Sequence, residues 1–248
     1  MTATHVIFRR EMRMALTTVF VYVKWAAFLA ASGWSLVEAL RRGEGGFVQV
    51  PALWAGTVAF WLPFLSTFAT MQSFSTERAS GTLETLLTAP VRESQVVWGK
   101  FHAAFMIGMV GLLLALLAPV LLLPRLAPLL TNSLSAWALL AAGLVLIVQL
   151  ALWTAVGLFF SLLWEQQAAA AACSLFFCLL LPRALAAAAA AWFPTAPLTT
   201  LGLSARAWAM DVASGLVTVS PLVCFSVVTW VFLLLSTLLL EARQIRTG

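Results

Sequence analysis

The sequence predicts an all-α, polytopic membrane protein with six transmembrane helices. Hydrophobic residues make up 62% of the 248 residues and charged residues only 9%, whereas a soluble domain carries about a quarter charged residues. The mean hydropathy is +1.01. The few charges flank uncharged stretches of about 20 residues, which is the length a helix needs to cross the hydrocarbon layer. Residues 1–248 therefore read as a single transmembrane domain.

The first helix is expected over residues 5–16, "HVIFRREMRMAL". A helix here places Phe8, Met12 and Ala15 on one face and most of its arginines elsewhere. This pattern suits a helix in the inner headgroup layer, and a simple basic flank to the first span is the alternative. The apolar run that follows is longer than a signal-peptide core, so we expect a retained first span.

Six spans follow from the gaps between charges. The first, 17–38, contains Lys24, which we expect to snorkel toward the headgroups rather than act as a buried functional charge. The second, 51–72, is expected to bend at Pro63. The others are predicted at 101–123, 136–163, 166–182 (after the turn "WEQQ") and 221–240.

Residues 183–220 are apolar but are broken by Pro194, Pro197, Gly202, Arg206, Asp211 and Gly215. Irregular backbone facing lipid would leave polar groups without partners. We therefore expect short, partly embedded helices that pack on protein at the outer face, before the sixth span.

The distribution of basic residues indicates the orientation. An even number of spans puts both termini on one side, and placing them in the cytoplasm also puts most of the 14 Lys and Arg residues there. We expect a multi-pass protein of the bacterial cytoplasmic (inner) membrane.

The predicted cytoplasmic segment 74–100 differs from the rest of the chain. In "STERASGTLETLLTAPVRESQVVWGK", Ser75 or Thr76 is expected to cap a helix, with Glu77 in its first turn. An apolar stripe follows at Leu83, Leu86 and Leu87, and Pro90 ends the segment. Such a helix either docks into the groove of a partner or lies on the inner leaflet.

The same segment resembles the first cytoplasmic loop of ABC-2 type transporter permeases, which reads E-R-x-x-G-T-L-E-x-L-L-x-x-P followed by a G-K pair. The pattern falls here on Glu77, Arg78, Gly81, Thr82, Leu83, Glu84, Leu86, Leu87, Pro90, Gly99 and Lys100. The final span and its exit, ending in "LLLEAR", are also similar to this family, and most of all to its gliding-motility-associated permeases. The matching parts cover about half of the chain. The Ala186–Ala191 run departs from the family, which often has a more polar stretch there.

The resemblance implies a permease subunit in which this segment is a coupling helix that docks on a separate ABC ATPase subunit. Leu83, Leu86 and Leu87 would supply buried contact, and Glu77, Arg78 and Glu84 would set the register through paired charges. Gly81 would permit close backbone approach, Thr82 belongs to the same motif, and Pro90 would stiffen the lever. ATP with Mg²⁺ would be bound by the partner subunit, and export is the direction that analogy suggests. Six spans are too few for a usual full transport pathway. The complex would therefore contain a second copy of this permease or a related permease, in contact with membrane lipid.

Other chemistry is not supported by the sequence. No G-x-x-x-x-G-K-[ST] motif occurs, so we expect no cofactor on this chain. Asp211 is the single aspartate and H-E-x-x-H is absent, so no catalytic or metal-ligating residues are assigned. The basic residues flank apolar runs, which argues against nucleic acid.

An ATP-independent scaffold or assembly subunit is the alternative to a transporter permease, and an adjacent gene with Walker motifs would discriminate the two. Candidates to line a path are Trp25, Trp61, Gln149, Trp153 and Thr154, with interfacial anchoring as the other interpretation of the tryptophans.

Overall fold

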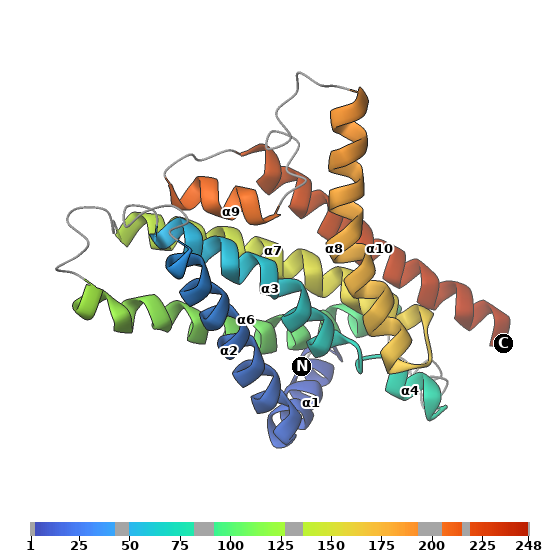
Figure 1. The fold of residues 1–248 in the computed structure, drawn as a ribbon. Helices are drawn as coiled ribbons and strands as arrows, with labels where there is room; N and C mark the ends of the chain where they lie inside the picture. The colour runs from blue at the N-terminus through green and yellow to red at the C-terminus, as the bar shows by residue number, and fades with distance from the viewer. Residues whose placement is uncertain are drawn as a thin grey trace.

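The computed structural model describes residues 3–42, 50–81, 92–126, 136–192, 205–214 and 219–247. Within these ranges the chain is almost entirely helical and contains no strand, which confirms the all-α class (Figure 1). The helices are α1 (Ala3–Thr17), α2 (Val19–Arg41), α3 (Val50–Thr70), α4 (Ser75–Ala79), α6 (Glu93–Leu126), α7 (Ala136–Leu163), α8 (Gln167–Trp192), α9 (Ala205–Ala213) and α10 (Ser220–Thr247).

Five segments of the described residues are long and apolar enough to cross a membrane, so the chain is a multi-pass membrane protein. They are Val19–Arg41, Ala52–Ala79, Glu93–Leu117, Leu140–Leu163 and Pro221–Ala242. The sixth predicted span, 166–182, falls on α8, whose apolar part in the described residues, Gln167–Leu180, is shorter than the roughly 20 residues a span needs. The count of six therefore stays a prediction.

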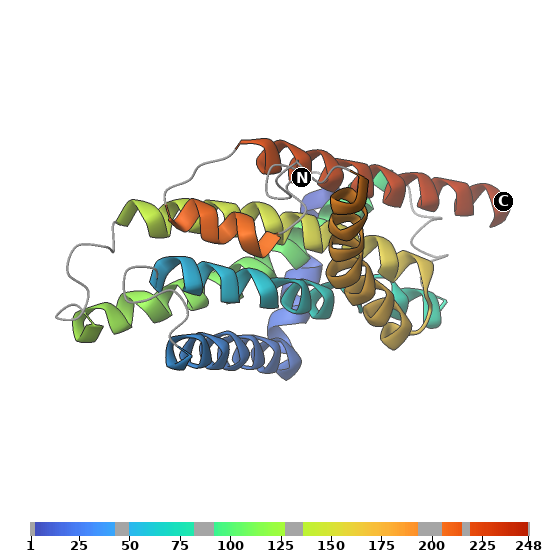
Figure 2. The same ribbon diagram turned by 45° about the horizontal axis from the view of Figure 1, so that its top comes forward.

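Helices α3 and α7 form the centre of the bundle. Inside the chain, 72% of the span window in Ala52–Ala79 is buried, against 22% in Val19–Arg41 and 22% in Pro221–Ala242. Figure 2 shows α2 and α10 on opposite sides, with α3 and α7 between them. The outer helices therefore present their apolar side chains to lipid.

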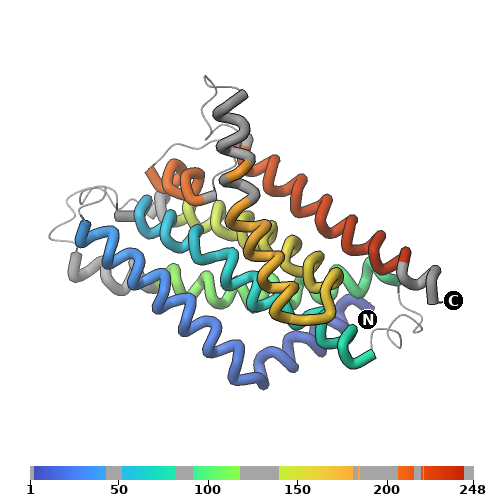
Figure 3. Tube along the Cα trace, turned by 45° about the vertical axis from the view of Figure 1, so that its right-hand side comes forward, coloured from blue at the N-terminus to red at the C-terminus, as the bar shows by residue number. Residues whose placement is uncertain are grey.

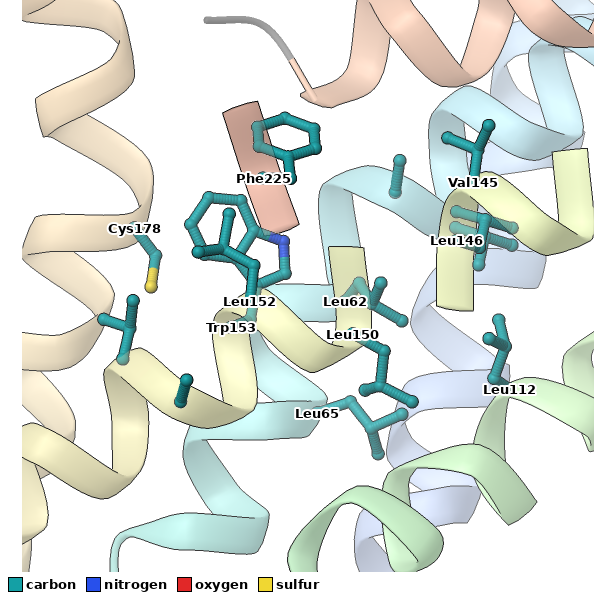
Figure 4. Close-up of a cluster of buried hydrophobic side chains, with 14 of the residues drawn as sticks. Leu62, Leu65, Leu112, Val145, Leu146, Leu150, Leu152, Trp153, Cys178 and Phe225 are labelled. Atoms are coloured by element: carbon teal, nitrogen blue, oxygen red, sulfur yellow. The ribbon is translucent and has the colours of Figure 1, made fainter. Parts of the chain in front are cut away.

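The apolar core follows the two faces of α7 (Figure 4). Leu150 lies between Leu62 and Leu65 of α3, and Leu146 and the α6 residue Leu112 belong to the same cluster. The other face of α7 directs Trp153 toward α8 and α10. Leu62, Leu112, Leu146 and Leu150 are fully buried.

Small and polar residues let the spans approach one another, because lipid supplies no hydrophobic drive between apolar helices. A Cβ atom at Gly157 of α7 would lie 2.2 Å from Oγ1 of Thr70 on α3. Nearby, the hydroxyls of Thr67 and Ser174 share a hydrogen bond of 3.1 Å between α3 and α8. These contacts hold α3 against its two neighbours.

Two tryptophans proposed as path-lining residues connect helices inside the bundle. The Nε1 atom of Trp25 donates a 3.0 Å hydrogen bond to the Ile107 carbonyl of α6. The Nε1 atom of Trp61 donates a 2.8 Å bond to Ser35 of α2. Their indole groups are thus satisfied by neighbouring helices.

The predicted boundaries differ most from the observed helices at the start of α6 and at the end of α8. Helix α6 begins at Glu93 rather than at residue 101, because Val96 and Val97 are buried and extend the apolar face backwards. Helix α8 runs to Trp192 through the Ala186–Ala191 run, where the fifth span was expected to end at residue 182 and short, partly embedded helices to follow. Alanine has the highest helix propensity, so this run continues the helix. The short helix α9 lies within the predicted outer segment and buries Trp208 against the bundle.

Candidate functional site

The segment that leaves α3 turns tightly and is fixed to α7. After α3 ends at Thr70, the chain makes a turn over residues 71–74 and enters α4. The backbone N–H groups of Phe74 and Ser75 donate to the Ser161 hydroxyl of α7, at 3.0 and 3.2 Å. Phe74 is completely buried. One hydroxyl therefore satisfies two backbone donors where the chain changes direction.

The predicted helix cap at Ser75 or Thr76 is wrong. The residue that caps α4 is Phe74, and it makes no side-chain cap bond. The hydroxyls of Ser75 and Thr76 instead donate back to the carbonyls of Met71 and Gln72, four residues earlier. Both hydroxyls therefore support the turn that leads out of α3.

Arg78 of α4 caps the C-terminal end of α7. Its Nη1 atom donates to the carbonyls of Leu162 and Leu163, at 3.2 and 2.6 Å, and its Nη2 atom lies 3.1 Å from Oε1 of Glu165. The last carbonyls of a helix have no partner within the helix, and they carry its negative dipole end. A guanidinium fits this position because it presents several donors in one plane.

Lys100 of α6 is the centre of a buried charged cluster. Its Nζ atom lies 2.9 Å from Oε1 of Glu11, 2.9 Å from Oε1 of Glu77 and 2.7 Å from the Ser73 carbonyl. The ammonium has three donors, and all three are used. Its side chain is only 2% exposed, a position that an ammonium tolerates only when it is paired and hydrogen-bonded. Lys100 thereby joins α1, α4 and α6 at one atom.

Gly99 allows α1 to reach this cluster. A Cβ atom at this position would lie 2.9 Å from Cγ2 of Ile7 and 3.2 Å from the Thr4 carbonyl oxygen, both on α1. Only a glycine leaves room for the helix to pack so closely. The adjacent Gly99 and Lys100 therefore both hold α1. Gly99 lets the helix pack closely on α6, and Lys100 forms the ion pair with Glu11 of α1.

Gly81 ends α4 in a left-handed conformation. Its φ angle is +70°, and its N–H donates a 3.2 Å bond to the Arg78 carbonyl. Among the described residues nothing lies within 4 Å of the position a Cβ would take. Inside this chain the glycine is therefore required by its backbone angle, as at many helix ends, and not by a close approach.

A cavity of about 190 Å³ adjoins the charged cluster. Its walls come from α1, α2, α6, the end of α3 with the turn that follows it, and α4. The polar lining includes Glu11, Thr18, Lys24, Gln72 and Lys100. Lys24 is partly buried, and its Nζ atom lies 4.4 Å from the centroid of the Phe20 ring.

Residues 8–245, nearly the whole chain, match the sequence profile of the family described as ABC-2 family transporter protein. This chain belongs to the ABC-2 transporter family. It is accordingly the membrane permease component of an ABC transporter and not itself an enzyme, and permeases of this family generally act with an ABC ATPase subunit. None of the curated proteins compared with the chain is a significant match.

The structure describes three of the predicted coupling residues of this ABC-2 permease. Glu77 and Arg78 lie on α4 and Gly81 follows it. The remaining six, Thr82, Leu83, Glu84, Leu86, Leu87 and Pro90, lie outside the described residues.

The sequence interpretation missed three residues of this ABC-2 permease that hold the segment in place: Glu11, Ser161 and Glu165. No local pattern marks them, because they lie on α1, on α7 and just after α7, far from residues 74–100 in the sequence. The one available signal was Lys100, a cation at the start of a long apolar run.

Proposed function

We propose that the chain is the permease subunit of an ABC exporter, in which residues 74–100 receive the movement of a separate ATPase that binds ATP with Mg²⁺. One observation carries the proposal: the base of this segment is bound to three other parts of the bundle. Lys100 connects it to α1 and α6, and Arg78 connects it to the end of α7.

A force applied to the segment would be transmitted through these contacts. Buried ion pairs with saturated hydrogen bonds are costly to break on one side only, so α4 and its partners move as a unit. Helix α7 is central in the bundle and α6 is a span, so this unit reaches both the core and the lipid-facing layer. Transition between inward and outward states would then be a rigid-body movement of spans.

The charged residues of the motif divide into two groups in this proposal. Glu77 and Arg78 have partners within the chain, so they anchor the segment. Glu84, with Leu83, Leu86 and Leu87, would face the ATPase. The register in which the segment docks on the ATPase would therefore be set by Glu84, and not by Glu77 and Arg78.

We also propose six spans, with α8 as the fifth in sequence order and both termini in the cytoplasm. In support, α1, α4 and the C-terminal part of α10 lie toward the same end of the bundle (Figure 3). The complex would contain two such permeases, identical or related, in a bacterial inner membrane. The likeness of the motif and tail to gliding-motility-associated permeases supports that branch of the family.

The experiment is a charge reversal in the complex of the permease with its ATPase, reconstituted in liposomes. Glu84→Arg is expected to abolish permease-stimulated ATP turnover while membrane insertion and yield stay normal. Glu241→Arg is the matched control, because Glu241 is an exposed glutamate on α10 and does not belong to residues 74–100. Normal stimulated turnover in the Glu84→Arg complex would refute the coupling role.

A further inference from the structure

We propose that the cavity beside Lys24 binds the phosphate of a phospholipid headgroup from the inner leaflet, with the acyl chains lying along α2. The proposal does not depend on the coupling role of residues 74–100. It depends on the charge of Lys24, the polarity of the cavity and the apolar surface at its mouth.

Among the described residues Lys24 makes no ion pair, and Glu11, the carboxylate that lines the same cavity, is paired with Lys100. Lys24 lies on α2, within a helix that is long and apolar enough to span the membrane. Its ammonium lies over the Phe20 ring. Lys100, which lines the cavity from α6, already has its three donors filled by protein groups. An anionic partner strongly stabilises a partly buried ammonium. Lys24 is therefore the group in the cavity that can bind a further anion.

The depth of Lys24 fits a headgroup. Helix α2 begins at Val19, so Lys24 lies about 7.5 Å along the helix axis, at 1.5 Å per residue. In a bilayer whose headgroup layer begins at Val19, this distance places Lys24 at the boundary between headgroups and acyl chains. Gln72 also lines the cavity, and its side-chain amide, which uses one N–H on Gln167, keeps a second N–H that can donate to a phosphate oxygen.

The mouth of the cavity is suited to acyl chains rather than to a free ion. Met14 and Phe20 belong to the lining and are 44% and 39% exposed. The apolar surface continues on α2 with Val19 and Val23, which are 74% and 54% exposed. A headgroup held at Lys24 would therefore place its acyl chains against side chains that already face lipid.

The test is lipid retention by the full-length chain in detergent, measured by native mass spectrometry after addition of phosphatidylglycerol or phosphatidylethanolamine. Both lipids carry the phosphate, so both are expected to bind the wild-type chain. Lys24→Met keeps the apolar length of the side chain and removes the charge. It is expected to weaken retention roughly tenfold, which corresponds to one charge-assisted hydrogen bond. Lys24→Arg is expected to retain lipid.

The matched control is Arg10→Met, which removes one exposed positive charge of α1 outside the cavity. Its retention is expected to equal that of the wild type. Equal retention by Lys24→Met would overturn the proposal. Should Lys24→Met not fold, Thr18→Trp fills the cavity with Lys24 intact and is expected to lower retention as well; unchanged retention would again refute the site.

A second arm distinguishes the source of the phosphate. Inorganic phosphate in excess over lipid is expected to leave the bound phospholipid in place, because it lacks the acyl contacts at Met14 and Phe20. Complete displacement by inorganic phosphate would show a site for a small free anion and would contradict a lipid site.

Discussion

The Nζ atom of Lys100 lies 2.9 Å from Oε1 of Glu11, so the third span is joined to the N-terminal helix by a buried ion pair. The same ammonium also binds Glu77, at the start of the segment that carries the family motif. The N-terminal helix is thus part of the structure that supports this segment.

Removing the cation should destabilise the cluster. Lys100→Met leaves two poorly exposed carboxylates without their partner, for which we expect a loss of about 3 kcal/mol. The measurement is the free energy of unfolding of the detergent-solubilised chain. Arg92→Met, at an exposed arginine that precedes α6, is the control and should change it little. A Lys100→Met chain as stable as the wild type would show that the ion pairs contribute nothing.

A methyl group at Gly99 should displace α1. Alanine in place of a helical glycine normally stabilises by about 0.5–1 kcal/mol. At Gly99 the new Cβ would clash with Ile7 and approach the Thr4 backbone, so we expect Gly99→Ala to be destabilising and to speed hydrogen exchange in α1. Gly33→Ala is the matched control, since nothing lies within 4 Å of that position and it should stabilise. If both variants stabilise, α1 does not pack on α6 as described.

The left-handed angle at Gly81 predicts a selective tolerance. Gly81→Ala should cost roughly 1–2 kcal/mol, because a Cβ disfavours a φ of +70°. Gly81→Asn should cost less, since asparagine tolerates this conformation. Thermal unfolding of both variants measures the difference, and equal midpoints would argue against the left-handed turn.

Arg78 should not be replaceable by lysine. A single ammonium cannot reproduce the contacts of the guanidinium with two carbonyls and Glu165, so Arg78→Lys and Arg78→Gln should both loosen α4. Hydrogen exchange of residues 75–81 reports the effect. Glu165→Gln should change it little, because the Glu165 side chain is 63% exposed and exposed ion pairs contribute little. If residues 75–81 of Arg78→Lys exchange as slowly as in the wild type, a single ammonium is enough to hold α4 in place.

Cysteine labelling would determine the topology. In a background lacking the three native cysteines, Ser80→Cys should react only from the cytoplasmic side. Gln166→Cys and Ser214→Cys, at exposed positions before and after α8, should react from opposite sides if α8 crosses the membrane. Reaction of both from the same side would reduce the count to five spans.

The sequence predicted the class of fold because few charges remain to face water and their positions delimit the apolar runs. It predicted α8 less well. The apolar part of this helix is short, and the alanine run that continues it has high helix propensity but little hydrophobic character of its own. Length and hydropathy therefore do not decide whether it crosses the bilayer.

The site was accessible to sequence reasoning only in part. The motif located the segment and its charges, but periodicity does not show which distant side chain a charge will meet. The partners Glu11 and Ser161 come from helices far along the chain, and the turn over residues 71–74 replaced the expected cap at Ser75. Such contacts are set by tertiary packing.

The ion pair between Glu11 and Lys100 also limits how α1 can move. One helical turn from Glu11 in either direction lie Ile7, Phe8, Met14 and Ala15, none of which is acidic. Sliding α1 by a turn would place an apolar group against a buried ammonium. Helix α1 therefore has a single permitted register on α6, and any displacement during the working cycle must carry both helices together instead of ratcheting one past the other.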